Sequence, residues 1–457
     1  MRTEEPYSIS NNRTKILLNL APYIDLVDNL RPEKIEGKVD EVVGFLIKAH
    51  NPGLRIGSSC NIINPETRKI VPGEAVGFKG DKILVMPLGE IRGIGPLSKI
   101  VPTTDQPFVA VGKALLGRTI DGMGKPLDDL GPIATDKKVS LYKEPTNPLL
   151  KRRIDAPLDV GIKALNGILT SGKGQRLAIL SGSGVGKSVL LGMMARNTTA
   201  DVNVIALIGE RGREVKEFIE KDLGKEGIKR SIIVAATSDQ SPLVRMRGAY
   251  LATAIAEFFR EEGKDVLLMM DSVTRFAMAQ REIGLAVGEP PTTKGYPPSV
   301  FAHLPKLLER AGNSASKGSL TGFYTVLVEA DDPLDPIGDA VRSIVDGHIL
   351  LDRNIAAQGH YPAIDVLRSK SRVMVDVASK THQKNARKLI QTLSTYKEAE
   401  DLINIGAYVK GSNPKIDYSL KKIDEINRFL QQDIGESSLL LESEAMLEQM
   451  FLDASDK

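Results

Sequence analysis

Between residues 101 and 378, short runs of consecutive apolar residues alternate with stretches whose apolar positions recur every three or four residues. Continuous runs such as Val202–Ile208 and Val266–Met270 are typical of strands that are buried on both faces of a parallel sheet. The intervening stretches, among them Ser188–Arg196 and Arg213–Asp222, predict the helices that cover such a sheet. These patterns predict an α/β domain with a parallel central sheet over residues 101–378.

The pattern before this region is different. Residues 31–100 contain short β-type runs, such as Ser59–Ile63 and Lys82–Met86, which are separated by turn signals such as Asn51-Pro52-Gly53. Short strands at regular spacing predict a small β-barrel domain.

After residue 378 the β-type runs disappear. Residues 379–457 predict a C-terminal helical domain, with separate helices at Asn385–Thr395, Glu398–Ile405 and Ile416–Gln431. The last stretch is acidic, and we expect it to be frayed or solvated. Its acidic residues are Glu442, Glu444, Glu448, Asp453 and Asp456.

Residues 1–30 form a separate N-terminal segment. Ile16, Leu20, Ile24 and Val27 share one helical face, but Pro22 interrupts it, so two short helical pieces are expected. This face could pack on the chain itself or on a neighbouring copy and so serve oligomerisation. The less favoured alternative is that it binds a separate regulatory partner.

Composition narrows the classes of function. The 457 residues suggest about three domains. Lys plus Arg number 61 and Asp plus Glu 58, and a net charge of +3 argues against a dedicated nucleic-acid binder. Cys60 is the single cysteine and there are five histidines, which excludes an internal disulfide and disfavours Cys- or His-based metal clusters. The sequence shows neither a signal peptide nor a long apolar run, so we expect a cytoplasmic protein.

One loop carries a specific chemical signal, because it follows a predicted strand and opens a predicted helix. Glycines let backbone N–H groups converge on phosphate oxygens at a helix N-terminus. Lys187 would reach the β and γ phosphates of ATP, and the Ser188 hydroxyl would ligate Mg²⁺. The first position of this phosphate-binding pattern is usually glycine, and here it is serine. The loop consists of Ser181, Gly182, Ser183, Gly184, Val185, Gly186, Lys187 and Ser188.

Two carboxylates follow predicted strands of the same sheet. Asp271 ends the run that begins at Val266, and it is the expected acid on the Mg²⁺ side. Glu210 follows the run that begins at Val202, where it could polarise the water that attacks the γ phosphate. Spacing alone leaves an ordinary charged loop equally open for Glu210.

Further segments of the sequence belong with the phosphate loop and the two carboxylates. They are Asn147-Pro148-Leu149, Pro157–Gly161, Gly174-Gln175-Arg176, Asp271–Ala277, Gly288–Pro291, Lys294–Ser299, His360–Asp365, Gly406-Ala407-Tyr408 and Gly411–Pro414. In aggregate, with the phosphate loop, they resemble the flagellar and type III secretion export ATPases, which are related to the catalytic subunits of rotary ATP synthases. The resemblance covers residues from about 35 to about 430. It implies a P-loop (RecA-like) ATPase core between a small N-terminal β-barrel and a C-terminal helical domain.

The resemblance also implies roles for single residues. Glu210 resembles the catalytic base, and Arg211 resembles a contact to the phosphates or to the glutamate itself. Arg275 resembles a residue that links the Asp271 strand to the site. Tyr361 resembles the aromatic residue that packs on the adenine, and Arg372 resembles an arginine finger that enters a neighbour's site. Such a finger stabilises the charge that spreads over the γ phosphate in the transition state.

The function that the resemblance implies is Mg²⁺-dependent hydrolysis of ATP, coupled to protein export through the flagellar type III secretion apparatus. Coupling to proton transport is left open. The implied partners are five further copies in a homohexamer, a stator-like regulator at the N-terminus, a central stalk protein, the export gate and chaperone–substrate complexes. No nucleic acid is expected, and the chain would associate peripherally with the cytoplasmic face of the inner membrane.

Three loops also have an expected place, the second of them from the resemblance and the acidic loop from its prolines and its distance in sequence from the phosphate loop. Gly406–Asp417 is the candidate contact with the stalk or cargo, and Val287–Ser299 would face the central channel of the ring. The acidic loop Asp331–Pro336 is expected to be a solvated subunit contact rather than a metal site.

Three alternatives stay open at this point. A virulence-type secretion ATPase shares the same motifs. An RNA-dependent ring motor of the transcription-terminator type would need stacking aromatics in its N-terminal domain, whereas residues 35–100 contain only Phe45 and Phe78. A non-catalytic ring subunit would lack the Glu210 carboxylate.

Overall fold

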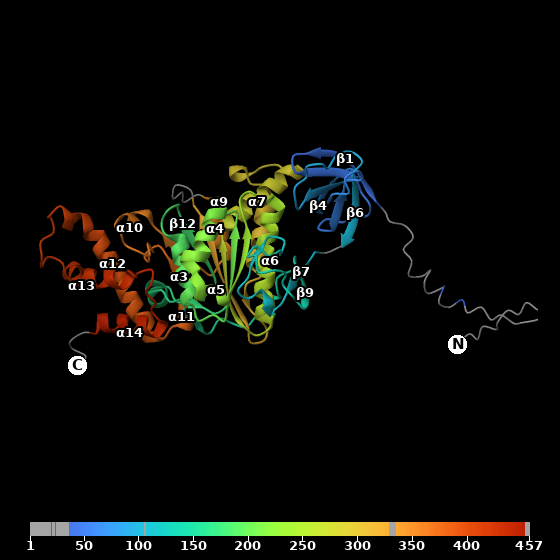
Figure 1. Cartoon of the computed structure of the whole chain (residues 1–457). Coiled ribbons are helices and arrows are strands. Elements are labelled where there is room, and N and C mark those ends of the chain that lie inside the picture. Colours follow the sequence, from blue (N-terminus) through green and yellow to red (C-terminus); the bar gives the residue numbers. More distant parts are fainter. Residues whose placement is uncertain (1–19, 21–22, 24–35, 105–106, 329–334, 453–457) are drawn as a thin grey trace, which may run out of the picture.

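The computed structural model describes residues 20, 23, 36–104, 107–328 and 335–452. Most of the predicted N-terminal helical face, apart from Leu20, and most of the acidic loop after Glu329 therefore lie outside the described residues. A β-barrel, an α/β domain and a group of C-terminal helices succeed one another along the molecule (Figure 1). None of the helices described combines the length and the hydropathy that crossing a membrane requires.

The N-terminal part is a small closed barrel, as the sequence predicted, and it has six strands. The strands pair in the order β1-β2-β5-β4-β3-β6. Closure leaves no unpaired edge, and inward side chains such as Ile47, Ile62 and Ile83 form a core of their own that includes Cys60. The strands are β1 Gly37–Val43, β2 Leu46–His50, β3 Ser59–Ile63, β4 Ile70–Lys79, β5 Lys82–Pro87 and β6 Lys99–Thr104.

The α/β domain is built on a nine-stranded sheet in the order β19-β18-β12-β17-β15-β13-β14-β8, with β16 paired to β17. All neighbours are parallel except β19 with β18 and β16 with β17. The strands are β8 Thr119–Asp121, β12 Arg176–Ser181, β13 Val202–Ile208, β14 Ser231–Ala236, β15 Asp265–Asp271, β16 Gly312–Asn313, β17 Ser319–Leu327, β18 Gly347–Leu351 and β19 Lys370–Ser371. Two small sheets flank it: β7 Phe108–Val111 with β9 Lys137–Ser140, and β10 Pro157–Leu158 with β11 Ser171–Gly172.

Helices cover both faces of the sheet, and its strands are buried as the continuous apolar runs predicted. In β13, Val204, Ala206 and Ile208 belong to one hydrophobic core, while Ile205 and Leu207 belong to the other. The helices of this domain are α2 Lys163–Ile168, α3 Lys187–Asn197, α4 Gly212–Glu217, α5 Gly224–Lys229, α6 Pro242–Glu261, α7 Val273–Val287, α8 Pro298–Leu308, α9 Pro336–Ile344, α10 Arg353–Ala357 and α11 Met374–Val377. Short 3₁₀ turns are η1 Lys113–Leu115, η2 Pro148–Leu150 and η4 Thr293–Gly295.

The predicted helix Arg213–Asp222 is more complex than a single α-helix. It begins as α4 and continues as the π-helical segment η3, Phe218–Leu223. Phe218 and Leu223 are both buried, and the wider helical turn brings them into the same hydrophobic core.

The C-terminal helices correct two sequence predictions. The expected break near Tyr396 is absent, and one helix, α12 Lys380–Asn404, replaces two because no Gly or Pro interrupts it. The acidic end is not frayed up to residue 451. Its helix α14, Leu440–Phe451, buries Leu447, Met450 and Phe451 on one side and leaves Glu442 and Glu448 exposed. Between them, α13 spans Pro414–Leu430.

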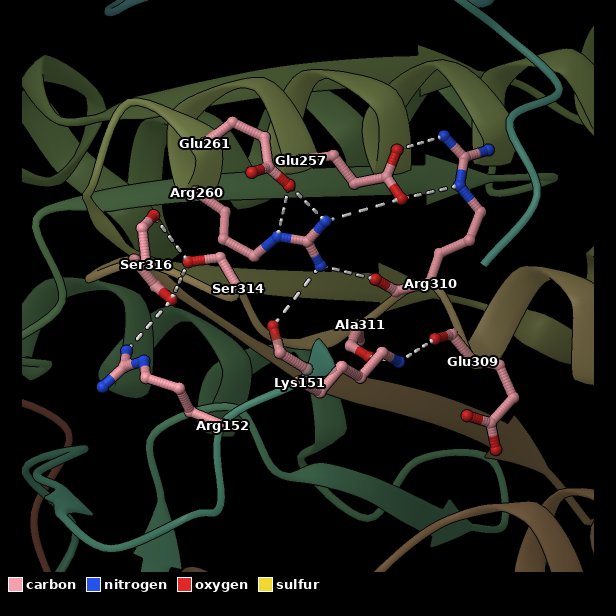
Figure 2. Close-up of polar contacts among 12 residues, drawn as sticks. Lys151, Arg152, Glu257, Arg260, Glu261, Glu309, Arg310, Ala311, Ser314 and Ser316 are labelled. Atoms are coloured by element: carbon pink, nitrogen blue, oxygen red, sulfur yellow. Dashed lines mark hydrogen bonds and ion pairs between the residues drawn. The ribbon is translucent and has the colours of Figure 1, made fainter. Parts of the chain in front are cut away.

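A buried ionic network fixes the sheet edge opposite the phosphate loop (Figure 2). Glu257 of α6 accepts two hydrogen bonds from Arg310, at 3.1 and 2.5 Å, and the Arg310 side chain is fully buried. Arg310 also donates to the carbonyl of Leu141, at 2.8 Å, while Arg260 donates to the carbonyl of Arg310. The network thus ties α6 and the segment after α8 to the residue that follows β9.

Candidate functional site

The phosphate loop lies between β12 and α3, where the sequence placed it. Gly184 and Gly186 have φ angles of 81° and 87°, in the left-handed region that glycine adopts readily. Ser181 is the last residue of β12 and pairs within the sheet, so a glycine is not required at that position. The loop therefore presents its backbone N–H groups at the N-terminus of α3.

Three charged side chains meet beside the loop. Lys187 Nζ lies 2.5 Å from Oδ1 of Asp271 and 4.0 Å from Oε1 of Glu210. Asp271 ends β15, Glu210 follows β13, and both strands deliver their residues to the same edge of the sheet. The Thr325 hydroxyl of β17 donates to Asp271 Oδ1 at 2.7 Å and fixes its carboxylate. The structure thus brings together the lysine and both carboxylates that the sequence singled out.

The Glu210 carboxyl has an unusual environment. Burial raises its pKa to about 7, and the negative charge of Asp271 adds to the rise, while the Lys187 charge opposes it. Its Oε1 atom is buried and has no hydrogen-bond partner among the described residues. A carboxyl group with a pKa near neutrality and a free acceptor atom is suited to holding a water molecule and taking its proton.

A cavity of about 600 Å³ opens in front of these groups, and Ser188 and Glu210 line it. Arg275 also lines it, from the first turn of α7, so it connects the Asp271 strand with the cavity. Arg211 lies at the mouth with an exposed side chain, and its guanidinium is paired with Glu214 at 2.9 Å. Cationic side chains around a phosphate-sized cavity can neutralise a polyphosphate.

Arg353 also lines this cavity, although the sequence pattern did not single it out. It begins α10, and a Cβ atom at Gly182 would lie 2.7 Å from its Nε and Nη2 atoms. The guanidinium therefore lies directly against the phosphate loop of its own chain. The sequence does contain a pattern that could indicate this position. The strand β18, whose residues alternate between buried and half-buried, ends at the same sheet edge just before Asp352 and Arg353.

A second hollow, of about 540 Å³, adjoins the other side of the loop. Tyr361 lines it, and a Cβ atom at Gly186 would lie 3.5 Å from the Tyr361 ring. Aliphatic side chains such as Val189, Leu190 and Ile434 line it together with polar residues 431–433, and no second aromatic residue lines it among the described residues. A flat apolar surface beside a phosphate loop is suited to a nucleobase.

Arg372 lies outside both cavities of its own chain. It follows β19 with an exposed side chain, and its backbone N–H donates to the Asp346 carbonyl at 3.0 Å. The fold of one chain therefore does not bring Arg372 to Glu210 and Lys187.

Three family models match successive parts of the chain. The β-barrel domain of the ATP synthase alpha/beta family matches residues 39–104, and the nucleotide-binding domain of that family matches residues 161–371. The C-terminal domain of the type III secretion ATPase EscN matches residues 378–449. A flagellum-specific ATP synthase of Pseudomonas aeruginosa is 49% identical over 95% of this chain and 97% of its own length. The chain belongs to the flagellar and type III secretion ATPases.

Other members of the flagellar and type III secretion ATPases are about as similar. A flagellum-specific ATP synthase of Bacillus subtilis is 51% identical over 93% of this chain and 97% of its own length. A type 3 secretion system ATPase of Xanthomonas euvesicatoria is 49% identical over 88% of this chain and 91% of its own. The solved structure of the assembled ATPase EscN from enteropathogenic E. coli matches with a TM-score of 0.86 and 45% identity, over 91% of this chain and 99% of that one. The family resemblance and the three-part fold predicted from the sequence are thereby confirmed.

Proposed function

We propose that this chain hydrolyses ATP to ADP and phosphate and uses the reaction to drive protein export through a flagellar type III secretion apparatus. The observation that carries the ATPase assignment is the meeting of Lys187, Asp271 and Glu210 beside a phosphate loop. Membership of the export ATPase family supports the coupling to secretion. A virulence-type apparatus stays the second candidate, because relatives of both kinds are 49% identical to this chain.

In this proposal one cavity holds the phosphates of the nucleotide and the other holds its base. The base would pack on Tyr361, and the phosphates would lie on the loop against Lys187, with Arg353 beside Gly182. Glu210 would hold the attacking water with its free Oε1 atom and accept its proton, which its pKa of about 7 favours. Arg211 would leave Glu214 to contact the phosphates.

The residues also fit Mg²⁺ bound together with ATP. Within residues 36–104, 107–328 and 335–452, no group of three His, Cys, Asp or Glu side chains could hold a metal ion alone. Mg²⁺ commonly binds few protein oxygens and takes its other ligands from phosphates and water. The Ser188 hydroxyl and the Asp271 carboxylate are oxygen donors of that kind, and the ion would neutralise charge on the phosphates.

The position of Arg372 supports a site completed by a second copy. Its side chain is exposed and outside its own cavities, so it would act as a finger in a neighbour's site within a homohexamer. A relative has been solved as the assembled ATPase EscN, and another structure shows EscN with its central stalk EscO. We extend the proposal to a stalk protein, a stator-like regulator, the export gate and chaperone–substrate complexes as partners of a cytoplasmic ring at the inner membrane.

Replacement of the base tests the proposed chemistry. Glu210→Gln should abolish ATP turnover and keep ATP binding, because the amide retains shape and hydrogen bonding but accepts no proton. The matched control is Glu226→Gln on α5, an exposed glutamate that should leave turnover unchanged. Unchanged turnover in Glu210→Gln would refute the assignment, and strong stimulation of the unaltered protein by single-stranded RNA would favour the ring motor instead. Restored swimming on expression in a strain without its flagellar ATPase would separate the flagellar from the virulence alternative.

A further inference from the structure

A separate cavity lies where the barrel meets the α/β domain. It has a volume of about 240 Å³ and is bounded by β4, the segment 142–145 that follows β9, and the helices α6, α7 and α8. Apolar side chains such as Val76, Leu243 and Ile283 make up much of its wall. It shares no lining residue with either hollow of the nucleotide site.

The buried charges at this cavity are already paired with each other. Glu74 is 4% exposed, forms an ion pair with Arg247 at 2.7 Å and accepts a hydrogen bond from the Tyr142 hydroxyl at 3.0 Å. The other charged lining residues, Lys143, Glu144 and Lys306, are exposed and of mixed sign. An ionic ligand would therefore lose its hydration without gaining a buried counter-charge, which favours a neutral ligand.

Two polar groups in the lining keep unused hydrogen-bonding capacity. The Gln280 side chain of α7 is 5% exposed, and its buried Oε1 atom has no partner among the described residues. The Tyr250 hydroxyl and His303 Nδ1 lie 3.2 Å apart and share one hydrogen bond. Burial lowers the pKa of His303, so its ring is neutral near pH 7 and the pair holds two protons. Whichever of the two donates to the other, one N–H or O–H donor stays free.

We propose that this cavity binds a small neutral molecule that carries an amide-like pair, an N–H donor and a C=O acceptor, on an apolar ring. The Gln280 oxygen would accept from the ligand N–H, and the free donor of the Tyr250–His303 pair would bind the ligand carbonyl. The aliphatic wall would take the ring. A few convergent polar groups in a largely apolar hollow are typical of small-molecule sites, and filling the free acceptor removes the cost of leaving it unpaired.

Benzamide is a suitable probe because it joins a carboxamide to a phenyl ring. With the full chain, ligand-observed NMR should detect benzamide binding, whereas benzoate, which is charged, and toluene, which lacks the amide, should bind more weakly. Saturating ATP should leave benzamide bound, because the two sites share no residue. Equal binding of the three compounds, no binding of benzamide, or its displacement by ATP would overturn the proposal.

Two variants separate this site from nonspecific binding. Gln280→Leu keeps the side-chain volume and should weaken benzamide binding roughly fivefold, the effect of one neutral hydrogen bond. The double variant Tyr250→Phe with His303→Phe keeps both rings, removes both possible donors and should act similarly. Gln391→Leu makes the same chemical change on the exposed face of α12 and should have no effect. ATP affinity reports that each variant is folded, and unchanged benzamide binding in both cavity variants would contradict the proposal.

Discussion

At the scale of single residues, the Glu210 carboxyl sets the expected pH dependence. Its pKa is raised to about 7 by burial and by Asp271, and the deprotonated form is the one that accepts a proton from water. The value of kcat/KM, which reports on free enzyme, should therefore fall as the pH drops below about 7. It should level off above that value.

The control for this pH dependence is Glu226→Gln, which should keep the profile of the unaltered chain. The residual activity of Glu210→Gln should not show the fall in kcat/KM below about pH 7. A flat profile in the unaltered chain from about pH 6 to pH 8 would show that another group limits the reaction.

Arg353 supports a second prediction at this scale. Its guanidinium lies against Gly182 in the phosphate cavity, so Arg353→Ala should weaken ATP binding roughly tenfold, the effect of one charge-assisted hydrogen bond. Arg353→Lys should recover part of the loss, since it restores the charge but not the planar fork. Arg213→Ala, in an exposed pair with Glu217, is the matched control for titration with labelled nucleotide. Equal ATP affinity in Arg353→Ala and the control would rule out a phosphate contact.

The residues around the phosphate loop differ in how far the sequence could locate them. Lys187, Asp271 and Glu210 each follow or open an element with a clear pattern, so the shared sheet edge could be inferred before the structure. Arg353 follows the same rule, since it comes just after β18, but a single arginine after a short strand does not by itself indicate a phosphate contact. The Thr325 contact with Asp271 joins residues 54 positions apart, and no local pattern encodes it.

At the scale of elements, the buried pair of Glu257 and Arg310 is expected to govern the stability of the sheet edge opposite the site. Glu257→Leu removes the carboxylate and leaves a fully buried guanidinium without its counter-charge. Breaking such a pair costs about 3–5 kcal/mol, because the remaining charge stays desolvated. Chemical denaturation should show this loss, while Glu226→Gln should change stability little. A loss within the range of ordinary surface substitutions would contradict the role of the network.

Elements whose sequence has one clear hydrophobic pattern could be predicted. Elements whose formation depends on tertiary contacts could not. The strands β12, β13, β14 and β15 lie where their apolar runs predicted, whereas β17 and β18 were not predicted. The acidic residues Glu442, Glu444 and Glu448 predict a solvated end, whereas the burial of the apolar residues 447, 450 and 451 holds α14 in place. His382 of α12 adds a contact to Glu444 at 2.8 Å, which only the folded chain creates.

At the scale of the whole molecule, a single chain contains all the residues of the proposed site but does not bring all of them together. Glu210 and Lys187 lie together, while Arg372 is exposed and lies outside the cavity. In a ring of identical chains each copy would supply its finger to the next one, so hydrolysis would depend on assembly. Neither the sequence nor the fold of one chain could reveal that contact directly, because it lies between copies.

The most direct test of this account is to mix two inactive variants, Glu210→Gln and Arg372→Ala. Each should hydrolyse ATP poorly alone, since one lacks the base and the other the finger. In rings mixed at equal ratio, about a quarter of the interfaces join an intact Glu210 to an intact Arg372, so about a quarter of the normal rate should return. A rate that stays at the average of the two variants at every mixing ratio would contradict a finger supplied by a neighbouring copy.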